Sequence, residues 1–166
     1  MELPKRKPTR LKGYDYSQSG AYFVTICTYK KQCTLGAIIV GQGLAPAEIK
    51  LSPCGKIAEE QLSELNNRYL TVKIEKYVIM PNHIHMIIRL DNAAGASPRP
   101  TISDVICTFK SMTTRLCNQF CDHEHQLFQS SFHDHIIRAE EDYLKIWQYI
   151  DTNPLKWELD CFYTKH

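Results

Sequence analysis

The strongest constraint on the fold is a pair of strand-like runs separated by only two residues. Residues 72–80 and 83–90 are rich in β-branched and apolar side chains, and Pro81-Asn82 between them turns the chain. Alternate side chains of a strand share one face. One face of the second run is wholly apolar and consists of Ile84, Met86, Ile88 and Leu90. The sequence therefore predicts two long consecutive strands, the second packing one face against helices.

The remaining elements are predicted from similar patterns. Ser52 and Pro53 suit the cap and the first position of a helix, and Thr101 with Asp104 fits a capping box. The predicted helices cover residues 51–66, 101–119 and 140–152. The further predicted strands cover residues 21–29, 36–41 and 132–138.

The order of these elements indicates the fold class. A strand and a short strand are followed by a loop through Gly43 and Pro46, a helix, two strands, a helix, a strand and a helix. This order predicts an α+β fold with a ferredoxin-like antiparallel sheet. With 166 residues, 43% of them hydrophobic, the chain can form one domain with a core, which we expect over residues 13–166.

The first twelve residues form a basic arm. They hold five basic residues and one acidic residue, a net charge of +4; the whole chain carries +2, so the remainder carries −2. Such an arm adds affinity for phosphate groups, although a solvated, disordered tail has the same composition. The residues expected to contact phosphates are Lys5, Arg6, Lys7, Arg10 and Lys12.

Signals for export and for membrane insertion are missing from the sequence. Its apolar runs are far shorter than the roughly 20 residues that span a bilayer, and no apolar stretch follows the N-terminal charges. Seven cysteines, an odd number without a regular framework, suit a reducing compartment. We therefore expect a cytoplasmic protein that does not interact with membranes.

Two histidines lie on the second face of the strand at residues 83–90. His83 and His85 project from the same side, together with Ile87 and Arg89. The two imidazoles are close enough to bind one cation, and imidazole accepts many divalent metals. Histidines on a half-exposed strand can equally be surface polar residues, so the pair alone leaves both interpretations open.

The helix predicted at residues 140–152 has side chains that could complete such a site. Tyr149 and Asn153 lie four residues apart at the edge of its apolar stripe, so both can reach the same neighbour. Pro154 disfavours helical geometry at Asn153. Alternatively, Tyr149 is a residue at the edge of the core whose hydroxyl bonds to a nearby group. The stripe consists of Tyr143, Ile146, Trp147 and Ile150.

Four segments, taken in order, resemble a known family. They cover residues 22–28, 77–88, 132–138 and 149–154, and include Met-Pro-Asn-His-Ile-His at 80–85 and Tyr-Ile-Asp-Thr-Asn-Pro at 149–154. Together they resemble the single-tyrosine HUH transposases, which move insertion sequences as single-stranded DNA. The resemblance extends over roughly residues 10–157. It is closest to the domesticated branch of that family, the REP-associated tyrosine transposases.

The resemblance implies a ferredoxin-like or RRM-like sheet with helices on one face and the active site on the other. It implies that His83 and His85 bind a divalent metal, Mg²⁺ or Mn²⁺, with help from Asn153, and that Tyr149 is the nucleophile. Insertion-sequence enzymes often have Gln where this chain has Asn153, which favours the REP-associated branch. The chain has no long basic C-terminal extension, so the arm would carry more of the affinity for DNA.

The implied reaction is transesterification at one phosphodiester of single-stranded DNA that carries hairpins or palindromic repeats. Tyr149 would form a 5′-phosphotyrosine and release a 3′-hydroxyl, so that rejoining needs no nucleotide cofactor. Because the pKa of a free phenol is near 10, a neighbouring cation, either the metal or Lys145, would favour the phenolate.

Two other functions fit the same residues. One is a metal-dependent hydrolase that uses water, and the other is a catalytically inactive module that binds DNA hairpins. The resemblance also implies association with the nucleoid, and it leaves open whether the protein forms a homodimer.

Several polar residues outside these motifs were also considered. Lys110 and Arg115 interleave with hydroxyl residues on the helix at 101–119 and suit phosphate contacts, although a solvated helix face is an equal alternative. His133 and His135 alternate like the first pair, but nothing further indicates a metal there. The residue types of a zinc site, without the spacing of a standard finger, occur at Cys117, Cys121, His123 and His125.

Overall fold

A computed structural model describes residues 13, 15–16, 18–39, 47–91, 100–121 and 125–163. The basic arm, with Lys5, Arg6, Lys7, Arg10 and Lys12, lies outside the described residues, as does His123. The strands are β1 (Gly20–Cys27), β2 (Gly36–Ile39), β3 (Glu48–Leu51), β4 (Val72–Met80), β5 (His83–Leu90) and β6 (His133–Ile137). The helices are α1 (Pro53–Arg68), α2 (Ile102–Cys121) and α3 (Glu140–Thr152), with short 3₁₀ segments η1 (Tyr29–Lys31) and η2 (Pro154–Leu159).

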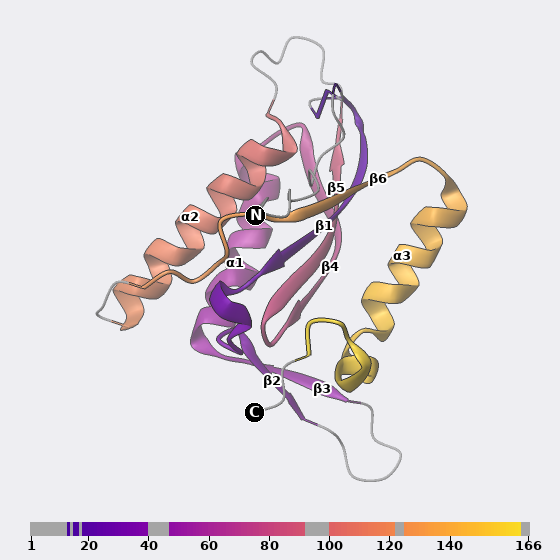
Figure 1. Ribbon diagram of the computed structural model, residues 1–166. Helices are drawn as coiled ribbons and strands as arrows, with labels where there is room; N and C mark the ends of the chain where they lie inside the picture. Colours follow the sequence, from indigo (N-terminus) through magenta and orange to yellow (C-terminus); the bar gives the residue numbers. More distant parts are fainter. Residues whose placement is uncertain are drawn as a thin grey trace, which may run out of the picture.

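Four strands form an antiparallel sheet in the order β4-β5-β1-β6, and β2 pairs with β3 in a separate two-stranded sheet. The first strand of the chain thus lies between the third and the last strands of the main sheet, which is the split β-α-β arrangement of ferredoxin-like folds. Helices α1 and α2 lie side by side on one face, and α3 lies on the other (Figure 1). The predicted fold class is confirmed.

The alternation of side chains on β5 divides the interior into two cores. The apolar face predicted from the sequence packs with α1 and α2, where Leu62 and Phe109 are fully buried or nearly so. Ile87 points the other way and packs with Ile146 and Ile150 of α3. None of the described helices is long and apolar enough to cross a membrane.

Two expectations about the chain path are wrong. Residues 48–50, expected to lie between a loop and a helix, and Leu51, expected in that helix, form β3. The alternation of Ile49 and Leu51 covers a stretch too short to be recognised without its partner strand. Asn153 has helical dihedral angles (φ −57°, ψ −43°) despite the following proline. Pro154 starts the next helical turn, η2, where its fixed φ is compatible with the chain direction.

A carboxylate on the sheet fixes the position of α3. Glu75 lies at a bulge of β4, where the register with β5 shifts between Ile74 and Lys76. Its carboxylate accepts hydrogen bonds from Arg89 Nε (2.7 Å) and from the hydroxyl of Tyr143 on α3 (3.0 Å). Such polar contacts add direction to the apolar packing of α3 on the sheet, and so help to define its rotation and depth.

We expect Tyr143→Phe to lower the free energy of unfolding by about 1–2 kcal/mol, because it leaves one acceptor of the half-buried Glu75 carboxylate without its phenolic donor. Chemical denaturation measures the change. Leu144→Ala, an exposed position on the same helix, is the control and should change stability by less than about 0.5 kcal/mol. Equal stability of Tyr143→Phe and wild type would show that this contact does not hold α3.

Candidate active site and metal centre

The two histidines of β5 lie at the centre of the site and are buried. His83 is 0% and His85 1% exposed, so the expectation of a half-exposed strand is wrong. The reason is that α3 and the C-terminal segment cover this face of the sheet. The rings of Trp157 and Phe162 pack on His83, at centroid distances of 5.9 and 4.7 Å, and Phe23 stacks on His85 at 5.3 Å.

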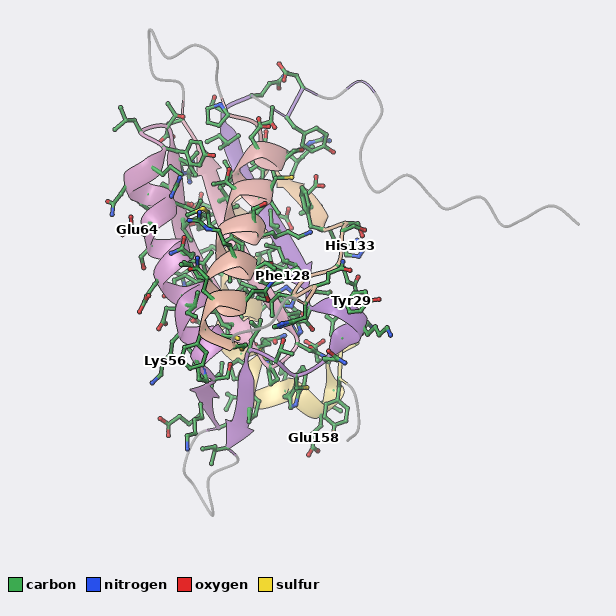
Figure 2. The ribbon with its side chains drawn as sticks, turned by 90° about the vertical axis from the view of Figure 1, so that its left-hand side faces the viewer. Tyr29, Lys56, Glu64, Phe128, His133 and Glu158 are labelled. Carbon is green, nitrogen blue, oxygen red and sulfur yellow. The ribbon has the colours of Figure 1, made fainter. Side chains whose placement is uncertain are left out.

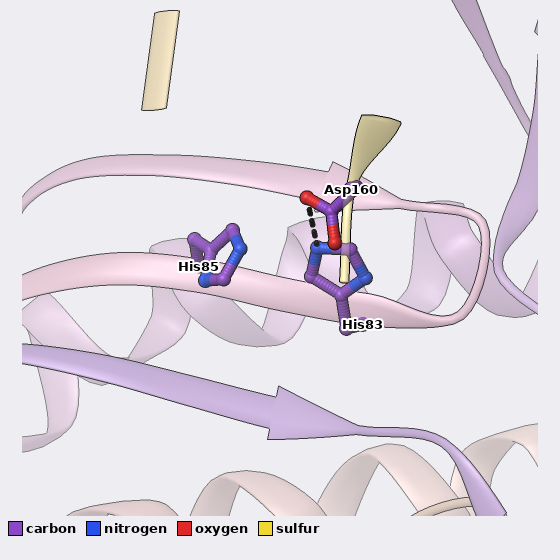
Figure 3. A group of neighbouring side chains, drawn as sticks. All are labelled: His83, His85 and Asp160. Carbon is purple, nitrogen blue, oxygen red and sulfur yellow. Dashed lines mark ion pairs between the residues drawn. The ribbon is translucent and has the colours of Figure 1, made fainter. Parts of the chain in front are cut away.

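A carboxylate that the sequence analysis missed joins the histidines. Asp160 lies over the pair, and its Oδ2 is 3.9 Å from His83 Nε2 (Figure 3). One ligand atom from each of His83, His85 and Asp160 lies within 4.8 Å of the others. No local pattern marks Asp160, which follows η2 in a segment without periodicity. The only feature of the sequence that could have pointed to Asp160 as a site residue is that it follows Tyr149 closely in the chain.

Hydrogen bonds orient the imidazoles. Asn82 Nδ2 donates to the carbonyls of Lys31 (3.2 Å) and Phe162 (2.8 Å), so Asn82 Oδ1 is an acceptor, and it lies 2.9 Å from His83 Nδ1. His83 Nδ1 therefore carries the proton, and the lone pair is on Nε2, which faces Asp160. His85 Nδ1 is similarly held by Thr25 Oγ1 at 2.8 Å. Such contacts are typical of histidines that bind metals.

Burial keeps both histidines neutral. Desolvation lowers the pKa of His83 to about 4, although the charge of Asp160 opposes the shift. Desolvation, followed by the neighbouring His83, also lowers the pKa of His85 well below its ordinary value. Neutral imidazoles bind metal without first losing a proton. The donor set, two imidazoles with a carboxylate and an amide nearby, therefore fits a divalent cation.

Two buried atoms support this fit. His83 Nε2 and Asn153 Oδ1 have no hydrogen-bond partner among the described residues. Asn153 Nδ2 donates to Asp160 Oδ2 at 2.7 Å, which places the Asn153 amide beside the same carboxylate. A buried polar atom without a partner is costly, and a cation between these groups would satisfy both atoms.

The phenol of Tyr149 borders the site. Its hydroxyl lies 3.2 Å from His85 Nε2 and 3.5 Å from Asp160 Oδ2, and the residue is 40% exposed. Desolvation, and then the charge of Asp160, raise the pKa of Tyr149 to about 12. Lys145, considered from the sequence as a neighbouring cation, is exposed on α3 and is not among the groups that shift this pKa.

Other candidate residues lie elsewhere. Lys110 and Arg115 are on α2, which covers the opposite face of the sheet. His133 is exposed at the start of the edge strand β6 (Figure 2), and His135 bonds to Asp142 at 2.7 Å. Within the described part of the chain, His83, His85 and Asp160 are the only group of three that could hold a metal, so the zinc-type residues, including Cys117, Cys121 and His125, form no such group there.

Comparisons with known proteins agree with this arrangement. Residues 51–153 match the family model described as "Transposase IS200 like". An uncharacterised protein of Haemophilus influenzae is 32% identical, over 95% of this chain and 93% of its own. A REP-associated tyrosine transposase bound to a REP hairpin has the same fold, with a TM-score of 0.64 and 19% identity over 89% of this chain and 74% of its own. A candidate transposase from Deinococcus radiodurans R1 is more distant, with a TM-score of 0.50 and 16% identity over 86% and 95%.

We expect Asp160→Asn to weaken Mn²⁺ binding by at least about tenfold, because Asp160 is the only anionic donor that the described residues place with the two histidines. Free Mn²⁺ can be measured by electron paramagnetic resonance. Glu158→Gln removes an exposed carboxylate two residues away and should leave the affinity unchanged. If both variants bind Mn²⁺ like wild type, Asp160 is not part of a metal site.

The lowered pKa values predict a flat pH dependence of Mn²⁺ binding. Between about pH 7.5 and about pH 6, both histidines stay neutral, so the affinity should change by less than about twofold. An imidazole with an ordinary pKa near 6.5 would be about three-quarters protonated at pH 6 and would weaken binding about fourfold. A loss of more than about tenfold over this range would mean that the imidazoles titrate normally.

Proposed function

The chain belongs to the IS200-like transposases, and on that premise we propose that it cuts and rejoins single-stranded DNA through a covalent bond to Tyr149. The observation that carries this proposal is the position of the Tyr149 hydroxyl, 3.2 Å from His85 Nε2 at the edge of the histidine pair. Tyr143, which is on the same helix, bonds instead to Glu75 and is far better explained as a structural residue.

The reaction is an in-line exchange at phosphorus. The Tyr149 oxygen forms a bond to phosphorus while the bond from phosphorus to the 3′-oxygen breaks. The phenol gives up its proton, and the departing 3′-oxygen takes one up, so the products are a 5′-phosphotyrosine and a 3′-hydroxyl. The new ester keeps the free energy of the broken one, so a second 3′-hydroxyl can displace the tyrosine without a nucleotide cofactor.

His83 and His85, with Asp160 and Asn153, are the residues that would hold a divalent cation, Mg²⁺ or Mn²⁺. Bound there, the cation would polarise a non-bridging phosphate oxygen and cancel the carboxylate charge that contributes to the raised pKa of Tyr149. The chain itself positions the nucleophile and keeps both imidazoles neutral and oriented.

The accessibility of the site favours an unpaired strand. Tyr149 is partly exposed, whereas the histidines are buried and packed against Trp157 and Phe162, so we expect a phosphate to approach from the Tyr149 side or after residues 154–163 move. A single strand is thinner and more flexible than a duplex and suits an approach to such a buried pair better. The REP-associated relative was solved with a REP hairpin, and we propose that this chain also acts beside a DNA hairpin.

We expect wild-type protein, incubated with Mn²⁺ or Mg²⁺ and a DNA hairpin carrying a single-stranded extension, to yield a protein–DNA adduct that survives denaturation. The reason is that a phosphotyrosine is a covalent ester. Tyr149→Phe should abolish the adduct, and mass spectrometry of the wild-type adduct should locate it at Tyr149. Tyr143→Phe removes the competing tyrosine of the same helix and should retain the adduct, because a loss of about 1–2 kcal/mol in stability leaves the protein folded with α3 docked.

The competing functions give different results in this experiment. Cleavage without an adduct, retained in Tyr149→Phe, would indicate a hydrolase that activates water. Binding of the hairpin without any cleavage in either metal would indicate a module that only binds DNA. An adduct on Tyr143 would contradict the assignment of the nucleophile.

A further inference from the structure

A polar groove of about 800 Å³ lies between α2 and the segment that leads into β6. Phe128, from that segment, packs against Phe109 of α2 and lies beside the helix in Figure 2. The groove is on the face of the sheet opposite to the histidines and is not used by the reaction above. Its lining residues on α2 are Lys110, Ser111, Thr114, Arg115, Asn118 and Gln119, and those of the segment are Gln126, Phe128, Gln129 and Ser130.

The charge of the groove is positive. Of the described residues that line it, Lys110 and Arg115 are cationic and none is acidic. The Lys110 ammonium donates to the carbonyls of Gln129 and Ser130, which holds its charge at the floor of the groove. Arg115 is exposed one turn further along α2. This charge contrasts with the body of the chain, which has a slight excess of acidic residues.

Several donors on the α2 side have unused hydrogen-bonding capacity. Ser111, Arg115 and Gln119 are spaced by four residues and therefore follow one line along the helix, with Thr114 beside it. None of these four side chains makes a hydrogen bond with another described residue. The line from Ser111 to Gln119 is about 12 Å long, which corresponds to about four phosphates of one strand along a duplex axis.

The groove is close to the candidate site across the edge of the sheet. Gln129 N donates to the carbonyl of Cys27 at 2.9 Å, and Cys27 pairs with His83 in the sheet. Two strand spacings of about 4.8 Å therefore separate the backbone of the groove segment from the backbone of His83. DNA passing around this edge could contact both places at once.

We propose that this groove binds the sugar–phosphate backbone of the double-stranded stem of the DNA hairpin, while the adjoining single strand enters the site at Tyr149. This inference rests on the proposed function. Hydroxyl, amide and guanidinium donors along a helix suit phosphate oxygens and carry no base preference. Among the described residues that line the groove, the one aromatic ring is that of Phe128, which is 3% exposed and offers unpaired bases little surface for stacking.

The test compares two DNA probes in the presence of a metal chelator, so that only binding is measured. One probe is a hairpin whose stem spans one helical turn and carries a single-stranded extension. The other is an unpaired strand of equal length that contains the same extension. For Arg115→Gln we expect about three- to tenfold weaker binding of the hairpin, a salt slope smaller by about 0.9, and unchanged binding of the unpaired strand. Arg68→Gln, an exposed arginine on α1 outside the groove, should bind both probes like wild type.

A second variant distinguishes the loss of a phosphate contact from a local structural disturbance caused by Arg115→Gln. Ser111→Ala with Thr114→Ala removes two hydroxyls without altering charge, and it should weaken hairpin binding while leaving the salt slope unchanged. Equal losses on both probes, or no loss on the hairpin for either variant, would overturn the proposal. The result does not depend on cleavage, so a missing phosphotyrosine adduct would refute the proposed function without affecting this test.

Discussion

The burial of two imidazoles on a central strand is the constraint on which the rest of the structure depends. His83 and His85 occupy positions in β5 where a ferredoxin-like sheet would otherwise present apolar side chains or face solvent. Burying them is tolerable only because Thr25 and Asn82 bond to their Nδ1 atoms and because desolvation keeps them neutral. The lone pair of His83 Nε2, which has no hydrogen-bond partner among the described residues, and the carboxylate of Asp160 beside it form the candidate site for a cation.

The same strand explains how the candidate nucleophile, Tyr149, is placed. Because successive residues of β5 alternate, its apolar side builds the main core, while Ile87, between the histidines and Arg89, anchors α3 on the other face. The tether from Tyr143 to Glu75, and the ion pair of Lys76 with Asp151, then fix α3 from two sides. Tyr149 is held at the edge of this contact, half in solvent, where a substrate can reach it.

Much of this architecture follows from sequence, and the exceptions have physical causes. The two faces of β5 and the limits of α3 depend on local periodicity, which the sequence displays. The proximity of Tyr149 to the histidines is a contact between distant segments, and only the family resemblance implied it. The burial of the histidines depends on α3 and the segment after it, which cover them. The periodicity of a single strand carries no information about the elements that pack on it. Asp160 reaches the site only through the path of η2, and β3 exists only through its pairing with β2, so neither has a local signature.

The continuity of the last described segment has a further consequence. Tyr149, Asn153, Asp160 and Phe162 all belong to one stretch of chain, which contributes the candidate nucleophile, two candidate ligands and part of the cover over the histidines. Helical dihedral angles at Asn153 join α3 directly to η2, and the residues of η2 and those that follow it cover the histidines. When α3 packs on the sheet, it therefore also brings the Asp160 carboxylate to the two imidazoles. A displacement of α3 would move the phenol and the carboxylate away from the imidazoles together. In such an arrangement the nucleophile cannot be aligned unless the donors are, which couples the chemistry to the packing of a single helix.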